Sequence, residues 1–597
     1  MKDFIKYMLA TICGIIILFV VVGIIFMVSI VSMVVASSQE TIVKENSVFV
    51  LKLNGSIQER GEADSPLNML LGEADMELMG LDDILASIKK AGEQDDIKGI
   101  YIEGGLSSFD SPATAQQIRD ALKDFRKSGK WIVAYADQYM QASYYVASVA
   151  DKVYMNHTGM LDFKGLGGKN EYMKGLYDKL GVKYQVAKVG KYKSYVERNT
   201  LTGMSEYDRE QREAYIQGIW QHWLMDIAES RKVTASQLDL LASDSIIGFA
   251  NPKDYVQAKL VDKLLYPDEV KKEVKSLLKI GDKDDINQLT LSDMKNLPKK
   301  EKEKGEEIAV YYAYGSIVDN NTTGIISTDH SIVGSTTVED LNKLAKNDDV
   351  KAVVLRVNSG GGSAAASEQI WHAIKQLKAK KPVVVSMGGA AASGGYMISA
   401  GANYIFAEPT TITGSIGIFG LIPNLSGLVT DKLGITFDGV KTNKYTDYEE
   451  NLVFGKEDDE EMKYMQGYVD RGYIKFLDIV SEGRKMKRDQ VNEIAQGRVW
   501  LAKDALKIKL VDKLGSLDDA IKKAAELAKI QEYHATSYPA PAGWMEQLLN
   551  QSEKKGSYLD GELRQILGDL YQPFAELHRD MQGSRLQARF PYQLEIK

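Results

Sequence analysis

Residues 352–402 read AVVLRVNSGGGSAAASEQIWHAIKQLKAKKPVVVSMGGAAASGGYMISAGA, and this stretch indicates the fold. A β-branched run at 352–357 is followed by glycines and then by a helical pattern at 365–379. The order then repeats, with a second β-branched run at 382–386, a glycine- and alanine-rich turn, and a helical pattern at 393–402. Strands that alternate with helices along a chain pair in parallel. The stretch therefore predicts an α/β domain built on a parallel sheet.

The same pattern occurs twice in the chain. VFVLKLNGSI at 48–57 resembles IAVYYAYGSI at 308–317, DDIKGIY at 95–101 resembles DDVKAVV at 348–354, and LVDKL at 260–264 recurs unchanged at 510–514. Three matches in the same order indicate an internal duplication. We predict two similar domains at residues 40–270 and 308–530, joined by a charged linker at 271–307 and followed by a helical tail at 531–597.

The N-terminal segment has a different composition. No charged residue occurs from Tyr7 to Gln39, and Lys2 and Lys6 precede the apolar run. A helix of this length exceeds the roughly 30 Å hydrocarbon core of a bilayer, and the preceding lysines favour a cytoplasmic N-terminus. We expect residues 1–39 to form a single-pass membrane anchor with the body on the outer side. A cleaved signal peptide is disfavoured, because its apolar region has only about 7–15 residues.

Composition argues against several classes of function. The 597-residue chain has a net charge of -8 and no basic patch interleaved with aromatic residues, so nothing points to nucleic acid. Its one cysteine, Cys13, lies in the apolar N-terminal run. This excludes disulfides within the chain, and cysteine metal sites or nucleophiles in the body. We expect neither a metal nor another cofactor.

Two glycine-rich turns in the second half are candidate sites of chemistry. VNSGGGS at 357–363 and GGAAASGGY at 388–396 each follow a predicted strand and precede a predicted helix. Small residues around Ser393 let a peptide backbone approach, and a helix N-terminus favours developing negative charge. The backbone N–H groups of Gly361 or Gly362 and of Gly394 are candidate oxyanion donors. The alternative, that these small residues serve only close packing, stays open; a phosphate loop is disfavoured because neither its GK[ST] ending nor GxGxxG is present.

A serine nucleophile needs a base to accept its proton. None of the six histidines lies in a small-residue motif, and neither HExxH nor GxSxG occurs in the chain. His372 falls on the predicted helix at 365–379 and is expected to be a packing or surface residue. A lysine base is the alternative.

Four motifs together resemble the long, duplicated form of the signal peptide peptidase A (protease IV) family. They are GGAAASGGYM at 388–397, NSGGGS at 358–363, TGSIG at 413–417 and VGKYKSYVE at 189–197, and the likeness extends to GRVW at 497–500 and to the chain's ending near 588–589. The resemblance implies tandem Clp-protease-like, crotonase-type α/β domains and a homotetramer. It also implies a serine–lysine dyad, with Ser393 as nucleophile and Lys193 as base. Gly360 departs from the proline that this family often has, which predicts a less stiff loop.

The activity that this resemblance implies is that of a serine endopeptidase. Such an enzyme is bound to the bacterial inner membrane, with its catalytic body on the periplasmic side. It degrades cleaved signal peptides and other apolar, extended peptides. Two other classes stay open. A crotonase-type acyl-CoA enzyme is disfavoured by the anchor, and an inactive scaffold is disfavoured by the retained serine and lysine.

The duplication divides the predicted dyad between the two halves. Aligned on the repeats, Gln141 lies opposite Ser393 and Thr446 lies opposite Lys193. The first half therefore lacks the nucleophile and the second half lacks the base, so the two halves complement each other.

A lysine base requires a pKa well below its ordinary value near 10.4. Burial away from carboxylates provides this, because it disfavours the charged amine. We expect Ser415 or Ser194 to hydrogen-bond the amine. Glu197 must point away from it or pair with Arg198. Lys191, two residues before the predicted base, is expected to be solvated.

Overall fold

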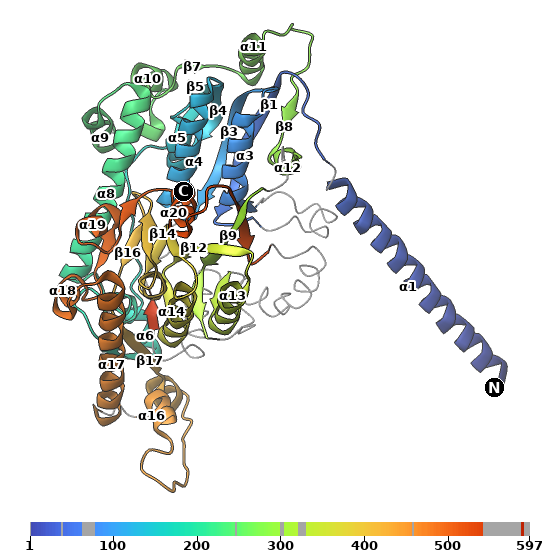
Figure 1. Ribbon diagram of the computed structural model, residues 1–597. Coiled ribbons are helices and arrows are strands. Elements are labelled where there is room, and N and C mark those ends of the chain that lie inside the picture. Colours follow the sequence, from blue (N-terminus) through green and yellow to red (C-terminus); the bar gives the residue numbers. More distant parts are fainter. Residues whose placement is uncertain are drawn as a thin grey trace.

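The two halves of the chain form separate, largely parallel sheets. The computed structural model describes residues 2–37, 40–61, 78–244, 247–298, 304–319, 330–455, 459–540 and 587–589. Within these residues one sheet has the order β2-β1-β3-β4-β5-β7, a second has the order β18-β16-β14-β12-β9-β20, and a third, smaller sheet joins strands from both halves. The edge strands of the first sheet are β2 (Leu78–Gly80) and β7 (Lys263–Leu264), and the second sheet includes β16 (Ile412–Gly414) and β18 (Val499–Leu501). Helices pack on the faces of these sheets (Figure 1).

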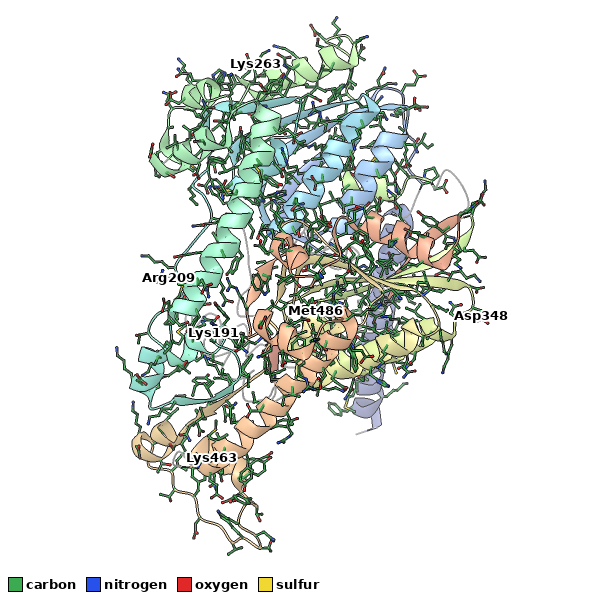
Figure 2. All side chains as sticks on the ribbon, turned by 60° about the vertical axis from the view of Figure 1, so that its left-hand side comes forward. Lys191, Arg209, Lys263, Asp348, Lys463 and Met486 are labelled. Carbon is green, nitrogen blue, oxygen red and sulfur yellow. The ribbon has the colours of Figure 1, made fainter. Side chains whose placement is uncertain are left out.

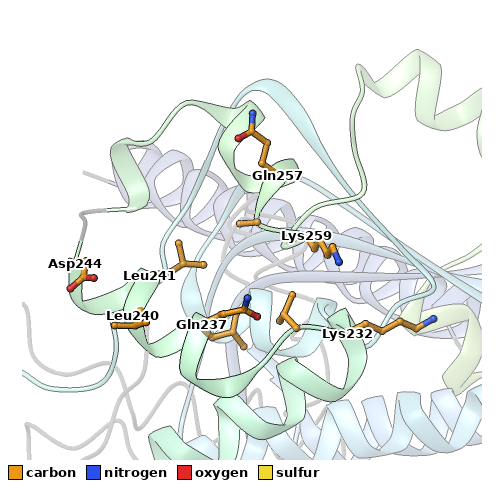
Figure 3. Close-up of a pocket in the computed structure, with 10 residues that line it drawn as sticks. Lys232, Gln237, Leu240, Leu241, Asp244, Gln257 and Lys259 are labelled. Carbon is orange, nitrogen blue, oxygen red and sulfur yellow. The ribbon is translucent and has the colours of Figure 1, made fainter.

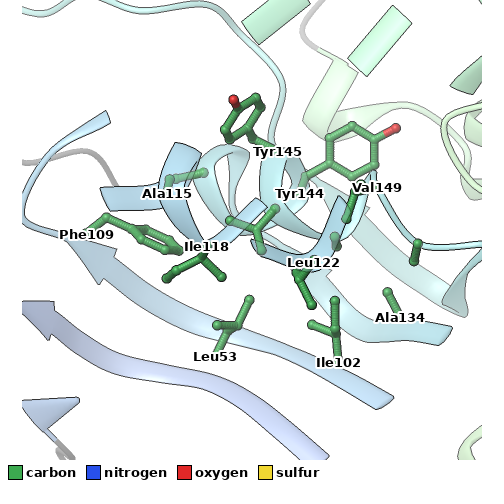
Figure 4. Close-up of a cluster of buried hydrophobic side chains, with 14 of the residues drawn as sticks. Leu53, Ile102, Phe109, Ala115, Ile118, Leu122, Ala134, Tyr144, Tyr145 and Val149 are labelled. Carbon is green, nitrogen blue, oxygen red and sulfur yellow. The ribbon is translucent and has the colours of Figure 1, made fainter. Parts of the chain in front are cut away.

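The first-half sheet is parallel, as alternation of strands and helices requires. Its central strands are β1 (Ser47–Gln58), β3 (Ile97–Phe109), β4 (Trp131–Tyr139) and β5 (Lys152–Leu161). The helices between them are α3 (Leu81–Glu93), α4 (Pro112–Phe125) and α5 (Gln141–Ala147). Leu53 and Ile102 of the sheet pack against Ile118 and Leu122 of α4 in one core cluster (Figure 4).

The second-half sheet repeats this plan. Its central strands are β9 (Glu306–Tyr314), β12 (Val350–Ser359), β14 (Val383–Ala392) and β15 (Tyr404–Ala407). The helices between them are α13 (Gly334–Lys346), α14 (Ala364–Lys378) and α15 (Gly394–Ser399). The predicted strand–helix order and parallel pairing are confirmed.

The helices after each sheet also correspond. The 26-residue helix α8 (Glu206–Arg231) has its counterpart in α17 (Asp459–Arg484), also of 26 residues. Each half then ends in a 12-residue helix, α11 (Pro267–Leu278) or α20 (Leu517–Ala528). The residue that ends each of these helices also corresponds. Lys279 and Lys529 both adopt a left-handed backbone conformation with φ 58°.

The domain boundaries expected from the sequence stay predictions. Helix α11 crosses residue 270, and β8 (Gln288–Leu289), inside the expected linker, pairs with β1. In the same way β20 (Tyr533–Tyr538), inside the expected tail, pairs with β9. The helical pattern expected around residues 544–577 lies outside the described residues.

Two contacts lock the halves together. Strand β6 (Lys183–Lys188) leaves the first half and pairs antiparallel with β17 (Phe419–Asn424) of the second half over six residues. Arg356 of β12 donates to Glu59 at 2.6 Å, and both side chains are buried. The first-half segment that follows β6 is thereby held against the second half.

Helix α1 (Lys2–Ser37) extends away from the body (Figure 1). Its apolar side chains are open to the surroundings; for example, Phe19 is 72% exposed. Over the described residues, no helix combines the length and the apolar content that crossing a membrane requires. The predicted membrane-spanning helix therefore finds no support there.

Candidate active site

Ser393 occupies a strained turn between β14 and α15. Its backbone has φ 56° and ψ -115°, a combination that residues with a side chain rarely adopt. The Ser393 N–H donates to the carbonyl of Gly414 at 2.8 Å, which ties the turn to the neighbouring strand. Strain of this kind, held by the surrounding structure, aims a side chain in a fixed direction.

Lys193 reaches Ser393 from the other half of the chain. Its Nζ lies 2.8 Å from the Ser393 Oγ, although the residues are 200 positions apart. Both side chains are fully buried. Burial lowers the pKa of Lys193 to about 7. Desolvation disfavours the charged amine, so a large fraction is neutral near neutral pH.

Ser415 holds the amine from its other side. The Lys193 Nζ lies 3.0 Å from the Ser415 Oγ and 3.1 Å from the Ser415 carbonyl oxygen. Ser415 itself has φ 49°, and its N–H donates to the Arg498 carbonyl at 2.7 Å. The amine thus has acceptors for its hydrogens, which leaves its lone pair for the Ser393 proton.

Residues of the second half hold the loop that carries Lys193 in place through hydrogen bonds and close backbone contact. The Tyr192 N–H donates to the Gln496 carbonyl at 3.0 Å. A Cβ at Gly497 would come within 2.8 Å of the Lys193 Cβ, so the two backbones approach as closely as glycine allows. Gln211 of α8 bridges the halves, since it donates to the Tyr192 carbonyl and accepts from the Val499 N–H, each at 3.1 Å. Sequence reasoning missed Gln211, because a glutamine within an ordinary helix carries no local signal.

Ser194 does not contact the amine, which corrects one of the two expected partners. Its hydroxyl donates to Asp208 Oδ1 at 2.6 Å. The loop turns between Gly190 and Lys193 through a backbone hydrogen bond of 3.2 Å, so adjacent side chains point in different directions. Ser415 is the expected hydroxyl that meets the amine.

Neighbouring charges are turned away from the amine. The Glu197 carboxylate accepts from the N–H and the hydroxyl of Ser205, at 3.1 and 2.8 Å. Arg198 pairs instead with Glu171 at 3.2 Å. Lys191 is exposed, as expected (Figure 2). Its amine lies 4.9 Å from the centre of the Tyr207 ring.

The glycines expected to donate to the oxyanion lie beside Ser393, but the N–H of one of them already donates to another residue. The Gly361 N–H donates to the Ser359 hydroxyl at 3.1 Å, so this glycine has a structural hydrogen bond where a free donor was expected. Gly394 begins α15 and borders Gly361. First-turn N–H groups have no acceptor within their helix. Gly394 and Gly362 stay predictions as donors.

Known proteins match the chain over most of its length. The sequence profile described as Peptidase family S49 matches residues 124–281 and again residues 375–531, one match in each half. The profile described as Clp protease matches residues 304–412.

The chain belongs to peptidase family S49.

Three relatives bear this out. Protease 4 of Salmonella typhi is 37% identical over 463 residues, which cover 76% of this chain and 73% of that protein. Protease 4 of Haemophilus influenzae is 33% identical over 84% of this chain and 83% of its own length. A chloroplastic serine protease SPPA of Arabidopsis thaliana is 28% identical over 82% of this chain and 70% of its own. The resemblance drawn from the four motifs is confirmed, and this S49 chain is a serine protease with a duplicated, Clp-protease-like α/β fold.

In this S49 chain, the two positions that correspond by duplication to Ser393 and Lys193 hold neither a serine nor a lysine. Gln141, opposite Ser393, accepts from the N–H groups of Lys164 and Gly165 at 2.8 and 2.9 Å and fills its own turn. Thr446, opposite Lys193, lies in an exposed loop and donates to the Asn443 carbonyl at 3.0 Å. His372 is exposed on α14, which agrees with its expected surface role.

A surface cavity of about 430 Å³ lies elsewhere in the first half (Figure 3). It is bordered by α9 (Ala235–Asp244) and α10 (Pro252–Gln257) and is lined by residues such as Leu238, Leu241 and Lys259. Neither Ser393 nor Lys193 lines it. The cavity and the buried pair are therefore separate places in the fold.

Proposed function

We propose that this S49 protease is a membrane-bound endopeptidase in which Ser393 is the nucleophile and Lys193 the general base. The observation that carries the proposal is the 2.8 Å contact between the Lys193 amine and the Ser393 hydroxyl, and among the described residues no carboxylate is bonded to the amine. The lowered pKa of Lys193, about 7, supports it. A neutral amine is required because the charged form cannot accept a proton.

The reaction follows from these positions. The neutral Lys193 amine takes the Ser393 proton while Oγ attacks the peptide carbonyl, and backbone N–H groups at Gly394 and Gly362 stabilise the tetrahedral oxyanion. The Lys193 ammonium then gives this proton to the departing peptide nitrogen, which leaves an ester on Ser393. Water attacks the ester as it gives a proton to Lys193, and the C–Oγ bond of the second intermediate then breaks while the Lys193 ammonium returns that proton to Ser393 Oγ, which releases the carboxylic acid and restores the neutral amine.

Matched lysine variants test the proposal. We expect Ser393→Ala and Lys193→Ala each to abolish peptide cleavage while the protein stays folded, whereas Lys191→Ala keeps most of its activity because Lys191 is exposed. A fluorophosphonate should label the wild type and not Ser393→Ala. Substantial activity in Lys193→Ala would show that another group is the base.

Location and substrates belong to the same proposal. Residues 8–35 contain no charged residue and are almost wholly apolar in sequence, and an apolar segment of this length is suited to a lipid environment. We infer that it anchors the enzyme in the bacterial inner membrane with the body on the periplasmic side. Cleaved signal peptides and other apolar, extended peptides then reach the enzyme by diffusion in the membrane plane.

A ring of identical chains is the assembly we propose, with four copies by analogy to the family. Residues 434–446, which we call the arm, correspond to 181–193 at an offset of 253. The first-half segment forms β6, pairs with β17 and holds Lys193. The arm instead exposes apolar side chains; Phe437 is 58% and Val440 102% exposed.

The partner surface for the arm follows from the same offset. Residues 166–171 correspond to 419–424 of β17, yet they are largely exposed and form no strand among the described residues. We infer that the arm of one copy pairs with 166–171 of the next, as β6 pairs with β17 within the chain. Head-to-tail contacts of this kind form a ring when the rotation between neighbouring copies closes on itself.

A further inference from the structure

The strand that leads to Ser393 contains a bulge. Val357 of β12 pairs with Met387 of β14. Two residues later Ser359 pairs with Ala391, so β14 advances four residues where β12 advances two. An irregularity of this kind disrupts the ladder of hydrogen bonds and redirects the residues that follow it. The bulge ends two residues before Ser393, so the groups that fix the bulge also fix the direction of the turn that carries this serine.

The side chain of Asn358 spans the bulge. Asn358 lies between the two paired positions of β12, and its Oδ1 accepts from the Ala390 N–H of β14 at 3.1 Å. On the other side of β12, its backbone carbonyl accepts from the Gly315 N–H at 3.0 Å. The side chain thus supplies the hydrogen bond that a buried backbone N–H needs where the ladder is interrupted.

Two carboxylates of the first half hold the amide of Asn358 in place. Glu59 directly follows β1, and Asp110 directly follows β3. The Asn358 Nδ2 donates to Glu59 Oε2 and to Asp110 Oδ2, each at 3.0 Å. Hydrogen bonds to an ionised acceptor are stronger than neutral ones. Because both amide hydrogens are used, Oδ1 is left to face the Ala390 N–H.

The first half also packs directly against the bulge. A Cβ on Gly388 would come within 2.9 Å of Glu59 Oε2, and one on Gly389 within 2.3 Å of Ser111 Oγ. Only glycine lets the two halves approach so closely at these positions. This contact accounts for the first two glycines of GGAAASGGY at 388–396.

We propose that Asn358 is a positioning residue for the Ser393 nucleophile, and that the first half holds it in place through Glu59 and Asp110. The proposal rests on the function proposed for Ser393, because it concerns the direction of that hydroxyl. The first half thus acts on the reaction twice, because it supplies Lys193 and also fixes the turn that carries the serine. A displacement of about 1 Å in such a site lowers the rate by roughly 100-fold.

Asp110 serves this role in either protonation state. Burial and the neighbouring Glu59 raise the pKa of Asp110 to about 7. A proton on Oδ1 is donated to the Thr114 hydroxyl, which then donates to Ser111 Oγ, 2.9 Å away. Oδ2 accepts from Asn358 in both states. We therefore expect Asp110→Asn to keep the contact, and the titration of Asp110 to add no second ionisation to the activity profile.

Steady-state kinetics on one peptide tests the proposal with a matched control. Asn403 Oδ1 accepts from the Val383 N–H at 2.9 Å, which is a bond of the same kind at the far end of β14. We expect Asn358→Ala to lower kcat about 100-fold and to leave KM and the pH midpoint unchanged, because its partners do not include the Lys193 amine. Asn403→Ala should match wild type.

Variants of Asp110 test the contribution of the first half. Asp110→Ala should lower kcat about tenfold, and Asp110→Asn should restore it to within about threefold of wild type. This pair carries the comparison if Asn358→Ala does not fold, which its melting temperature shows. Equal kcat for Asn358→Ala and wild type, an equal loss in Asn403→Ala, or a loss that falls on KM alone would overturn the inference.

Hydrogen exchange separates this inference from the proposed function. In Ser393→Ala protein, where no cleavage occurs, the backbone amides of residues 388–392 should exchange about tenfold faster when Asn358→Ala is added, and at an unchanged rate when Asn403→Ala is added. If this holds but the wild type neither cleaves peptides nor reacts with a fluorophosphonate, the Ser393 function fails and the contact that fixes the bulge stands. If the wild type is active but Asn358→Ala changes neither exchange nor kcat, the positioning inference fails alone.

Discussion

At the scale of single residues, Lys193 combines a catalytic advantage with a cost in stability. Its amine is neutral in the folded protein above a pKa of about 7, whereas an unfolded lysine stays protonated up to about 10.5. Between these values the unfolded state binds more protons, so this group makes the fold more stable as pH rises from about 7 to 10.5. Below pH 7 the full cost of burial is present.

Removing this amine should therefore stabilise the fold. We expect Lys193→Met to raise the free energy of unfolding at pH 7 by a few kcal/mol, on the order of the pKa shift converted at 1.36 kcal/mol per unit. The gain should shrink as pH approaches 10. Urea unfolding at both pH values measures it, and a Lys193→Met protein less stable than wild type at pH 7 would contradict the burial argument.

Ser415 and Ser194 form a matched pair of hydroxyls around the same lysine. Ser415→Ala removes a partner 3.0 Å from the amine, and we expect kcat/KM to fall tenfold or more because the lone pair loses its orientation. Ser194→Ala should change kcat/KM by less than about threefold, since this hydroxyl serves Asp208. Steady-state kinetics on one peptide compares them, and equal losses would count against Ser415 as the orienting group.

At the scale of elements, local patterns located the strands and helices well and their ends less well. The strand expected at 352–357 is β12, and the helix expected at 365–379 is α14 at Ala364–Lys378. β14 extends past the expected residue 386 to Ala392, because Ala390–Ala392 pair with β16. The helix expected at 393–402 is shorter, because Ser393 takes a left-handed φ and α15 ends at Ser399.

The parts of the site that no local pattern predicts depend on contacts distant in sequence. The turn that separates Lys191 from Lys193 is held by Gln496 from the other half, so an extended segment was the simpler expectation. Strand β21 (Gln587–Arg589) lies in a tail for which only helix was expected, and it exists by pairing with β13 (Gly361–Ser363) and β17. Motif resemblance, not spacing, indicated which lysine meets Ser393.

Gln211 of helix α8 allows a test of the contact that joins the Lys193 loop to the second half. We expect Gln211→Ala to lower kcat/KM at least tenfold and to raise the pH midpoint of activity, because a loosened loop admits water to the Lys193 amine. The exposed Gln217 on the same helix gives the control Gln217→Ala, which should match wild type. A pH profile of each variant distinguishes lost positioning from simple destabilisation. Indistinguishable profiles for the two variants would remove Gln211 from the site.

At the scale of the whole molecule, duplication leaves each half incomplete. The first half contributes β6 and Lys193 to the second, whereas the arm of the second half pairs with no strand in the described part of the chain. An unsatisfied copy of a contact that is satisfied elsewhere in the chain favours assembly with another copy.

Charges on the arm should therefore break the ring. We expect the body beginning at residue 40 to form tetramers and the double variant Ile435→Asp/Val440→Asp to yield smaller species. Leu240→Asp, at another exposed apolar position, should leave assembly unchanged. Light scattering at micromolar concentration measures the masses. A fully active monomer of the unaltered body would contradict the proposed ring.

The pH dependence of kcat/KM tests the central claim most directly, because it reports the ionisation of the base itself. Only the neutral Lys193 amine accepts the Ser393 proton, so activity should rise with pH along a single ionisation with its midpoint near 7. Glu197→Gln should keep this midpoint, since the carboxylate is bonded to Ser205 and not to the amine. A wild-type profile still climbing steeply at pH 10 would show that the base is a solvated amine and that the buried pair does not carry the reaction.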